Sequence, residues 1–263
     1  MTYRRRALVV AAAAALMVQT AAGVAGAQDF SWSGAIAQGR AIEIKGINGD
    51  IRAEPSGSNQ VEVVAVKSAR RDDPESVRVQ VVPHGGGVTI CAVYPSRSGA
   101  QPNECAPGEG GRNNVQNNDV VVRFTVRVPA GVTFIGKTVN GDVEALRLNG
   151  DVEVKTVNGS ATFSTTGGGR ASTVNGSIRG EMGRADWSDT LAMSTVNGSI
   201  TLTLPPTLST EVRASTVNGD LTADFPMTLQ GRISRRRIEG TIGGGGRLLS
   251  LETVNGSITL KRE

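Results

Sequence analysis

Residues Ser194–Pro205 read STVNGSITLTLP, a Thr-Val-Asn-Gly tetrapeptide followed by a short alternating pattern of apolar and polar residues. The same tetrapeptide occurs six times, each time followed by Ser or Asp, and two looser copies read INGD and LNGD. The eight asparagines are Asn48, Asn140, Asn149, Asn158, Asn175, Asn197, Asn218 and Asn255. Repetition of one short unit predicts a repeat architecture in which stacked copies share one continuous core.

The segments that flank each Asn-Gly pair have the pattern of half-buried strands. Before Asn255, the apolar or small positions are Leu251 and Thr253; after it, they are Ile258 and Leu260. A period of two is typical of a strand with one buried face. The buried phase shifts from even to odd positions across Asn-Gly, so we expect the chain to bend there.

Two kinds of bend fit this shift, because Asn-Gly suits both a two-residue hairpin turn and the corner of a β-solenoid. The residue before Asn is aliphatic in every copy, including a ninth, degenerate copy that reads RIEGTI around Glu239. A tight hairpin would turn these aliphatic side chains away from the core, whereas a solenoid corner lets them point inward. We therefore predict an all-β fold, a single-chain β-solenoid (β-helix-like), with inward corner valines and asparagines hydrogen-bonded between coils.

The repeats divide the chain into two parts. Residues 136–263 carry the regular TVNG repeats and are expected to form the regular solenoid. Residues 28–135 are less regular and are interpreted as degenerate β coils or a capping β-layer over one end of the stack. The charged tail Lys261–Glu263 is expected to blunt the strand edge at the other end.

The first 27 residues have the features of a signal peptide. Arg4–Arg6 precede an apolar run, Ala7–Met17, and Ala25–Ala27 provide a small-residue cleavage site before Gln28. No other stretch reaches the roughly 18 apolar residues of a membrane-spanning helix. The sequence thus predicts an exported protein without a transmembrane segment, located in the periplasm or at the cell surface.

Net charge gives little support for binding to polyanions. The full chain carries +4, and removing the three arginines of the predicted signal leaves 4 − 3 = +1. A balance this close to zero does not favour a nucleic-acid partner.

The only two cysteines are Cys91 and Cys105, which flank a loop rich in Pro, Gly, Ser and Asn. In an oxidising compartment they are expected to form a disulfide, and closing a loop of about 15 residues contributes about 3 kcal/mol. A redox or metal-binding pair is the alternative, but neither a Cys-x-x-Cys spacing nor a nearby histidine supports it.

The serial TVNGS and TVNGD corners, with the segments STVNGSITLTLP, ASTVNGDLTADFP and LETVNGSITLKR, resemble the bacterial putative-adhesin domain family of unknown function. The resemblance extends from about Ile44 to the C-terminus and is clearest after Lys137. It implies an exported β-solenoid. It brings no catalytic residue to this chain.

The residues themselves provide few candidates for chemistry. His84 is the only histidine, which excludes a histidine-rich zinc site and makes a Ser-His-Asp mechanism depend on one loop residue. Asp142 and Asp151 follow Asn-Gly and could stack on neighbouring strands, where a carboxylate pair binds Ca²⁺ or acts as acid and base. Aspartate is also a common solvated turn residue. We expect no catalytic, cofactor-binding or metal site, and leave calcium binding at these two positions open.

Surface contact is the remaining possibility. Trp187 lies in an irregular insert between two repeats, although the same ring could instead cover a corner of the core. Arg235, Arg236 and Arg237 form a basic cluster that could touch anionic lipid or sugar phosphate, or simply discourage strand pairing at an edge.

The favoured function is a non-enzymatic exported cell-envelope protein, an adhesin or surface-binding β-solenoid without a cofactor, whose partner is an envelope or surface protein or glycan. One alternative is a periplasmic structural or envelope-stress accessory protein, for which self-association is possible. A third is a polysaccharide-active β-helix enzyme.

Overall fold

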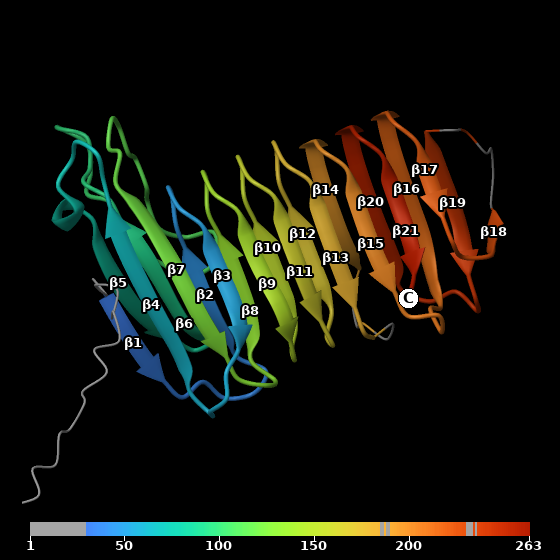
Figure 1. Cartoon of the computed structure of the whole chain (residues 1–263), viewed down its shortest axis with the longest axis horizontal. Coiled ribbons are helices and arrows are strands. Elements are labelled where there is room, and N and C mark those ends of the chain that lie inside the picture. The colour runs from blue at the N-terminus through green and yellow to red at the C-terminus, as the bar shows by residue number, and fades with distance from the viewer. Residues whose placement is uncertain (1–29, 185–186, 188–189, 230–233, 235) are drawn as a thin grey trace, which may run out of the picture.

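The computed structural model describes residues 30–184, 187, 190–229, 234 and 236–263. Over these residues the chain forms β-strands and one short 3-10 turn, η1 (Pro74–Ser76), with no α-helix. The strands make two sheets that face each other along a stack (Figure 1). In the same ranges, no helix is long and apolar enough to cross a membrane.

Sheet A contains ten strands. Their spatial order is β1 (Phe30–Gly34), β4 (Val61–Ser68), β7 (Val121–Val128), β3 (Ile51–Pro55), β9 (Val143–Leu148), β11 (Ala161–Thr165), β13 (Ile178–Met182), β15 (Ile200–Leu204), β21 (Ile258–Arg262) and β17 (Leu221–Ala223).

Sheet B contains eleven strands. Their spatial order is β5 (Arg78–His84), β6 (Gly87–Val93), β2 (Ala41–Lys45), β8 (Thr133–Lys137), β10 (Val152–Lys155), β12 (Gly169–Ser172), β14 (Leu191–Asn197), β20 (Leu248–Asn255), β16 (Thr210–Asn218), β19 (Arg237–Ile242) and β18 (Met227–Leu229).

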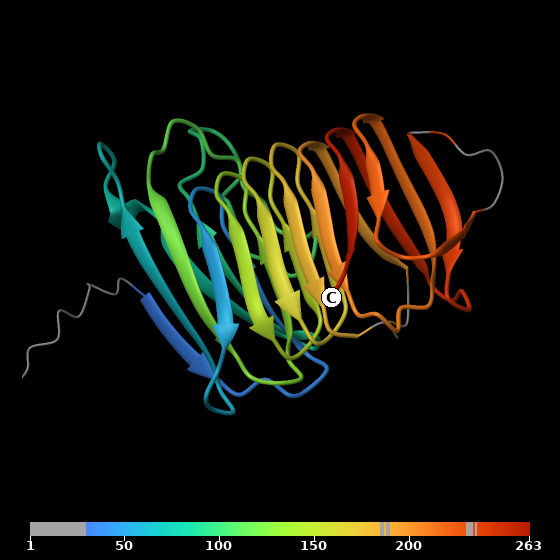
Figure 2. The same cartoon turned by 45° about the vertical axis from the view of Figure 1, so that its right-hand side comes forward.

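Each regular coil contributes one strand to each sheet, and successive coils stack in parallel (Figure 2). The strand of sheet B ends at an Asn-Gly corner, where the chain crosses to sheet A and runs back. Pairing is in register between repeats, so Ile200 lies beside Ile258 and Leu202 beside Leu260. The prediction of an all-β solenoid is confirmed.

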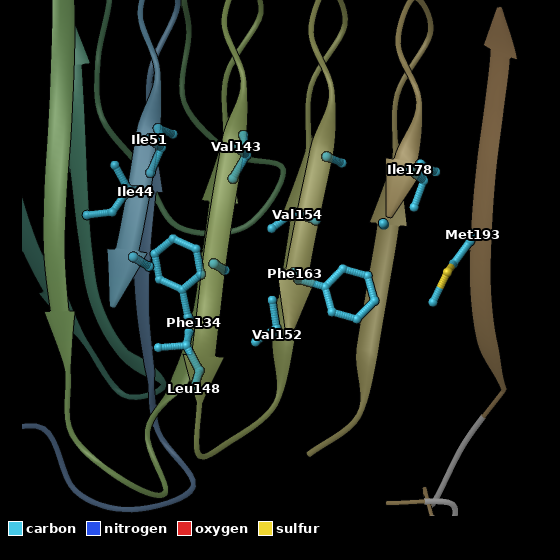
Figure 3. Packing of buried hydrophobic residues seen from close by; sticks show 14 of the residues in the cluster. Ile44, Ile51, Phe134, Val143, Leu148, Val152, Val154, Phe163, Ile178 and Met193 are labelled. Carbon is cyan, nitrogen blue, oxygen red and sulfur yellow. The ribbon is translucent and has the colours of Figure 1, made fainter. Parts of the chain in front are cut away.

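The core lies between the sheets and consists of the inward residues of both (Figure 3). Phe134 and Phe163 are its largest members in the middle of the stack, and both are fully buried. Phe163 faces Gly180 on the next strand, where an added Cβ would come within 2.5 Å of the ring. Glycine at this inward position therefore makes room for the ring of the neighbouring coil. Burying such a side chain contributes about 2 to 3 kcal/mol.

The N-terminal end of the stack is closed by antiparallel pairing. In sheet A, β4 pairs antiparallel with β7, and β1 pairs antiparallel with β4. In sheet B, β5 pairs antiparallel with β6. These strands end the parallel register on which the inner coils depend.

The last repeat in the sequence is not the last coil in space. β20 lies between β14 and β16, and β21 lies between β15 and β17. Lys261 and Arg262 therefore belong to an inner strand, paired with Thr203 and Leu204. The prediction that this tail blunts the end of the stack is wrong: sheet A ends at β17 and sheet B ends at the β19–β18 hairpin.

The corner valines do not face inward, which corrects the prediction made from their aliphatic character. Their side chains are 38–51% exposed, and the six residues are Val139, Val157, Val174, Val196, Val217 and Val254. The threonine before each valine is buried instead. Strand alternation thus continues up to the asparagine, placing Thr inside and Val outside.

Two of the predicted corners differ from the rest. Asn149 lies between β9 and β10, at the edge of the stack opposite the TVNG corners, and the preceding Leu148 is buried. Glu239 is not at a corner, because it lies within the straight strand β19, which pairs antiparallel with β16. These two copies have the sequence pattern of the repeat but do not lie at the edge of the stack where the TVNG corners lie.

Candidate binding surface

The TVNG corners form an asparagine ladder along one edge of the stack. In each step the Nδ2 of one asparagine donates to Oδ1 of the asparagine in the adjacent coil at 2.8 Å. In spatial order the ladder contains Asn48, Asn140, Asn158, Asn175, Asn197, Asn255 and Asn218. At the first member, Nδ2 of Asn48 instead donates to backbone carbonyls of Asn118 and Val120.

A second row of hydrogen bonds lies just inside the ladder. The buried Thr173 donates from Oγ1 to the carbonyl of Gly159 at 2.8 Å, and the equivalent bond recurs in the neighbouring coils. The glycines of the corners stack closely, because a Cβ on Gly176 would collide with the backbone of Gly159. The corner sequence thus specifies a rigid edge.

The aspartates after Asn-Gly accept hydrogen bonds from the next coil. The N–H of Asp142 donates to Oδ1 of Asp50 at 3.0 Å, and the N–H of Ser160 donates to Oδ1 of Asp142 at 2.7 Å. Asp151 lies at the opposite edge of the stack, where it accepts from Gly168.

Asp142 and Asp151 are therefore separated by the length of β9, and the expectation that they stack on neighbouring strands is wrong. Over the described ranges, no group of three or more His, Cys, Asp or Glu residues is arranged to hold a metal ion.

The outer face of sheet A is strongly charged near the N-terminal end. Arg52 donates through Nε and Nη2 to Oε2 of Glu144 at 3.1 and 2.7 Å. Beside this pair is a hollow of about 350 Å³. Its polar lining consists of Asp50, Arg52, Arg123, Thr125, Asp142 and Glu144.

Further along the same face, a second hollow of about 430 Å³ crosses several coils. Its side chains are mostly hydroxyl-bearing or charged: Thr162, Ser164, Arg179, Glu181, Thr201, Thr203 and Lys261. Because the strands pair in register, these outward side chains lie in straight rows across the sheet. The outer face of sheet A thus offers two polar hollows on a rigid support.

The outer face of sheet B is covered near the same end by the loop between β6 and β7. The predicted disulfide between Cys91 and Cys105 is confirmed, with a Cα–Cα distance of 5.7 Å. Lys45 fastens the loop further, because its Nζ donates to the carbonyls of Ala106, Gly108 and Gly110 at 2.8–2.9 Å.

Glu43 lies beneath this loop and is 3% exposed. Its Oε2 accepts from Thr89 Oγ1 at 2.8 Å and from the N–H of Gly108 at 2.9 Å, while Nζ of Lys137 lies 2.9 Å from Oε1. Burial alone would raise the pKa of Glu43, but the hydrogen bonds from Lys137, Gly108 and Thr89 outweigh it and hold the pKa below its usual range.

Lys137 shows the matching effect. Burial alone would lower the pKa of its ammonium group, but its hydrogen bonds to the carboxylates of Glu43 and Glu109 raise that pKa above the usual value. The pair is therefore ionised at neutral pH, and it ties the loop to sheet B.

Tyr94 anchors the segment that leads back from this loop. Its hydroxyl donates to the carbonyl of Val120 at 2.8 Å and lies 3.4 Å from the carbonyl of Asn48, the first residue of the ladder. Burial raises the pKa of Tyr94 to about 12.

His84 takes part in local hydrogen bonds. Its Nδ1 accepts from the N–H of Gly86 at 3.1 Å, and its Nε2 lies 3.2 Å from Oγ1 of Thr89. The Thr89 hydroxyl has a single proton and donates it to Glu43, so in the contact with His84 the Nε2–H donates and Oγ1 of Thr89 accepts. The imidazole therefore hydrogen-bonds within the turn between β5 and β6 and contacts Thr89, which is itself a hydrogen-bond partner of Glu43.

The predicted surface contacts are not brought together. Trp187 is half-buried and packs against the core, which fits the covering role better than a free surface ring. Arg235 lies outside the described residues. Arg237 pairs with Glu239 at 2.6 Å, and Arg236 is exposed. Trp187 and the arginines as a contact site stay a prediction.

Only the structure reveals the contacts of Glu43, Lys45 and Lys137 and the Arg52–Glu144 pair. Each pair joins residues far apart in the chain, so no local pattern marks them. The buried threonines carried a signal, because Thr is present in all six TVNG copies.

The Toastrack DUF4097 family matches residues 36–261. Among solved structures, the chain is similar to a "putative cell adhesion protein" from Clostridium sporogenes, with 11% identity, a TM-score of 0.47, and coverage of 89% of this chain and 99% of that one. It is also similar to a "putative adhesin" from Bacteroides fragilis, with 11% identity, a TM-score of 0.26, and coverage of 89% and 96%. No curated protein matches the sequence.

Proposed function

The chain belongs to the Toastrack DUF4097 family, and from the geometry of its sheets we propose that it is a non-enzymatic cell-envelope protein that binds a surface partner. The binding surface is the outer face of sheet A. The protein is exported, and its partner is an envelope or surface protein or glycan.

One observation carries this proposal: the outer face of sheet A has two polar hollows lined by hydroxyl and charged side chains, and from β11 to β21 these side chains lie in register. Rows of this kind present hydrogen-bond donors and acceptors at the spacing of neighbouring strands, about 4.8 Å. The ladders of Asn and Thr along the corner edge of the stack hold that spacing rigid, so little conformational entropy is lost on binding.

Binding is tested with a matched pair of arginine variants. Arg179 lies in the second hollow on sheet A, whereas Arg170 lies on the outer face of sheet B. The probes are a panel of purified bacterial envelope polysaccharides and purified envelope proteins. We expect Arg179→Ala to weaken binding by about tenfold and Arg170→Ala to leave it unchanged.

Equal binding by both variants would place the binding surface elsewhere. Turnover of a polysaccharide by the wild-type chain would contradict the non-enzymatic function.

Location is tested independently by cell fractionation combined with protease treatment of intact cells. Digestion of the chain in intact cells supports an adhesin at the surface. Protection in intact cells, with recovery in the periplasmic fraction, supports the accessory role inside the envelope.

A further inference from the structure

The two sheets end unevenly at the C-terminal end of the stack. Within the described residues, sheet A stops at β17, whose one strand partner is β21. Sheet B continues past β16, the coil partner of β17, by two strands, β19 and then β18. The end of the molecule is therefore a step two strands deep, seen at the right of Figure 1.

The inner face of the protruding hairpin is apolar. Ile238, Gly240 and Ile242 of β19 point inward, as their pairing with the inward residues of β16 requires, and Met227 and Leu229 of β18 point to the same side. Sheet A provides no described strand opposite them. Ile242 and Gly240 are nonetheless buried within one copy, whereas Met227 and Ile238 are half-buried and Leu229 is 41% exposed.

The strand edges at the step are also open. β17 and β18 are each three residues long, and each ends its sheet. The backbone N–H of Asp224 donates to the carbonyl of Leu260, and the carbonyl of Asp220 accepts from the N–H of Ile258. In a parallel pair this alternation directs the backbone N–H and C=O of Thr222 toward β21. The backbone N–H and C=O groups of Leu221 and Ala223 therefore point to the open edge of the sheet. No described residue pairs with that edge.

We propose that this step is an interface between two copies of the chain. A two-fold axis parallel to the strands, midway between the sheets, would exchange the two layers. The β19–β18 hairpin of each copy then fills the two-strand gap in the other, and β17 of one copy pairs antiparallel with β18 of the second. The apolar inner faces of the two hairpins pack against each other between the layers.

Three features favour a second copy as the occupant. The protrusion and the gap have the same depth of two strands, so the end is complementary to itself, as an isologous two-fold interface requires. The strands to be paired have equal lengths. Their charges also match, because Asp220, just before β17, and Arg236, just before β19, lie at the same edge of the stack, the edge of the TVNG corners. No described residue forms an ion pair with either side chain.

The inference extends beyond the proposed function and does not depend on it, because the proposed interface begins at β17, beyond β21, the last strand that lines a hollow on sheet A. Pairing two copies would also remove both open strand edges, which otherwise promote uncontrolled association.

The first test compares lysine substitutions at two similarly exposed aliphatic residues. Leu229 faces the proposed interface and is 41% exposed, whereas Val66 lies on β4 near the other end of the stack and is 38% exposed. Sedimentation equilibrium of the purified wild-type chain should give twice the mass of one chain. Leu229→Lys should raise the dimer dissociation constant by about tenfold or more, and Val66→Lys should leave it unchanged.

The second test does not depend on a destabilising substitution. Thr222 and Thr228 lie on outer faces of opposite sheets within one copy, but side by side across the proposed interface. The double variant Thr222→Cys, Thr228→Cys should therefore form a covalent dimer on oxidation, and neither single variant should. A monomeric wild-type chain, an unchanged dissociation constant for Leu229→Lys, or failure of the double variant to cross-link would overturn the proposal.

Discussion

The side-chain amide nitrogen of Asn158 lies 2.8 Å from Oδ1 of Asn140 in the adjacent coil, although 17 residues of chain lie between the two. The same bond joins every neighbouring pair of TVNG asparagines. Each inner asparagine therefore both donates and accepts, whereas the last one, Asn218, only donates within the described part of the chain.

This asymmetry predicts unequal effects of alanine substitution. Asn175→Ala removes two side-chain hydrogen bonds and should lower the free energy of unfolding by about 1 to 2 kcal/mol. Asn218→Ala removes one and should cost about half as much. Urea denaturation measures both. Equal losses would show that the ladder contributes nothing beyond each residue's preference for the corner.

Neighbouring residues in one corner provide a second test. Thr173 is 5% exposed and donates to the carbonyl of Gly159, whereas Val174 is 39% exposed. Thr173→Val leaves that half-buried carbonyl without its threonine donor and should cost about 1 to 2 kcal/mol. The reverse exchange next to it, Val174→Thr, should change stability by less than about 0.5 kcal/mol. If Val174→Thr destabilised the protein more than Thr173→Val, the valine would have to point into the core, as expected from the sequence.

The lowered pKa of Glu43 predicts how stability depends on pH. A carboxyl whose pKa is lower in the folded state stabilises the fold fully above its ordinary value of 4.5, and that contribution is lost as pH falls through the folded pKa. Glu43→Gln should therefore be markedly less stable than wild type at pH 7, by about 3 kcal/mol, and the difference should shrink below about pH 4.

The control is Glu109→Gln, because Glu109 also contacts Lys137 but its side chain is 84% exposed. This exchange should have little effect at any pH. A constant difference between wild type and Glu43→Gln across the acidic range would contradict the burial of an ionised pair.

Tyr94 permits a direct titration. The chain has two tyrosines, and Tyr3 lies in the predicted signal, so a preparation without residues 1–27 reports Tyr94 alone. Ultraviolet absorbance should show a midpoint near 12, where an exposed tyrosine titrates near 10.0. A midpoint near 10 in the folded chain would mean that the hydroxyl is exposed to solvent and does not donate a hydrogen bond to the carbonyl of Val120.

Truncation tests the insertion of the last repeat. Removing residues 258–263 deletes β21, which in the described part of the chain is the only strand partner of β17, and leaves β15 as an edge. Hydrogen exchange should accelerate in both remaining strands, with loss of protection over 200–204 and 221–223. If the tail merely blunted one end, exchange in β15 would not change.

The sequence by itself determined the all-β solenoid, its corners and its disulfide, because these depend on local features: a period of two, Asn-Gly bends and two cysteines around one loop. The same alternation placed the threonines in the buried phase, since it continues from Val152 and Val154 through Thr156, and their burial is confirmed. The prediction that Val157 faces the core was wrong because it relied on the aliphatic side chain and not on the position of Val157 in the alternation of inward and outward residues.

Only the tertiary structure decided the order of the last coils, the separation of Asp142 from Asp151 and the burial of Glu43 against Lys137. Copies with nearly identical sequences can pair with one another in several orders, so the repeat pattern does not specify that β20 and β21 insert before β16 and β17. The pairing of the β19–β18 hairpin with β16 and the pairing of distant charges depend on long-range contacts. Such contacts form only when the whole stack assembles, and for that reason no local pattern in the chain records them.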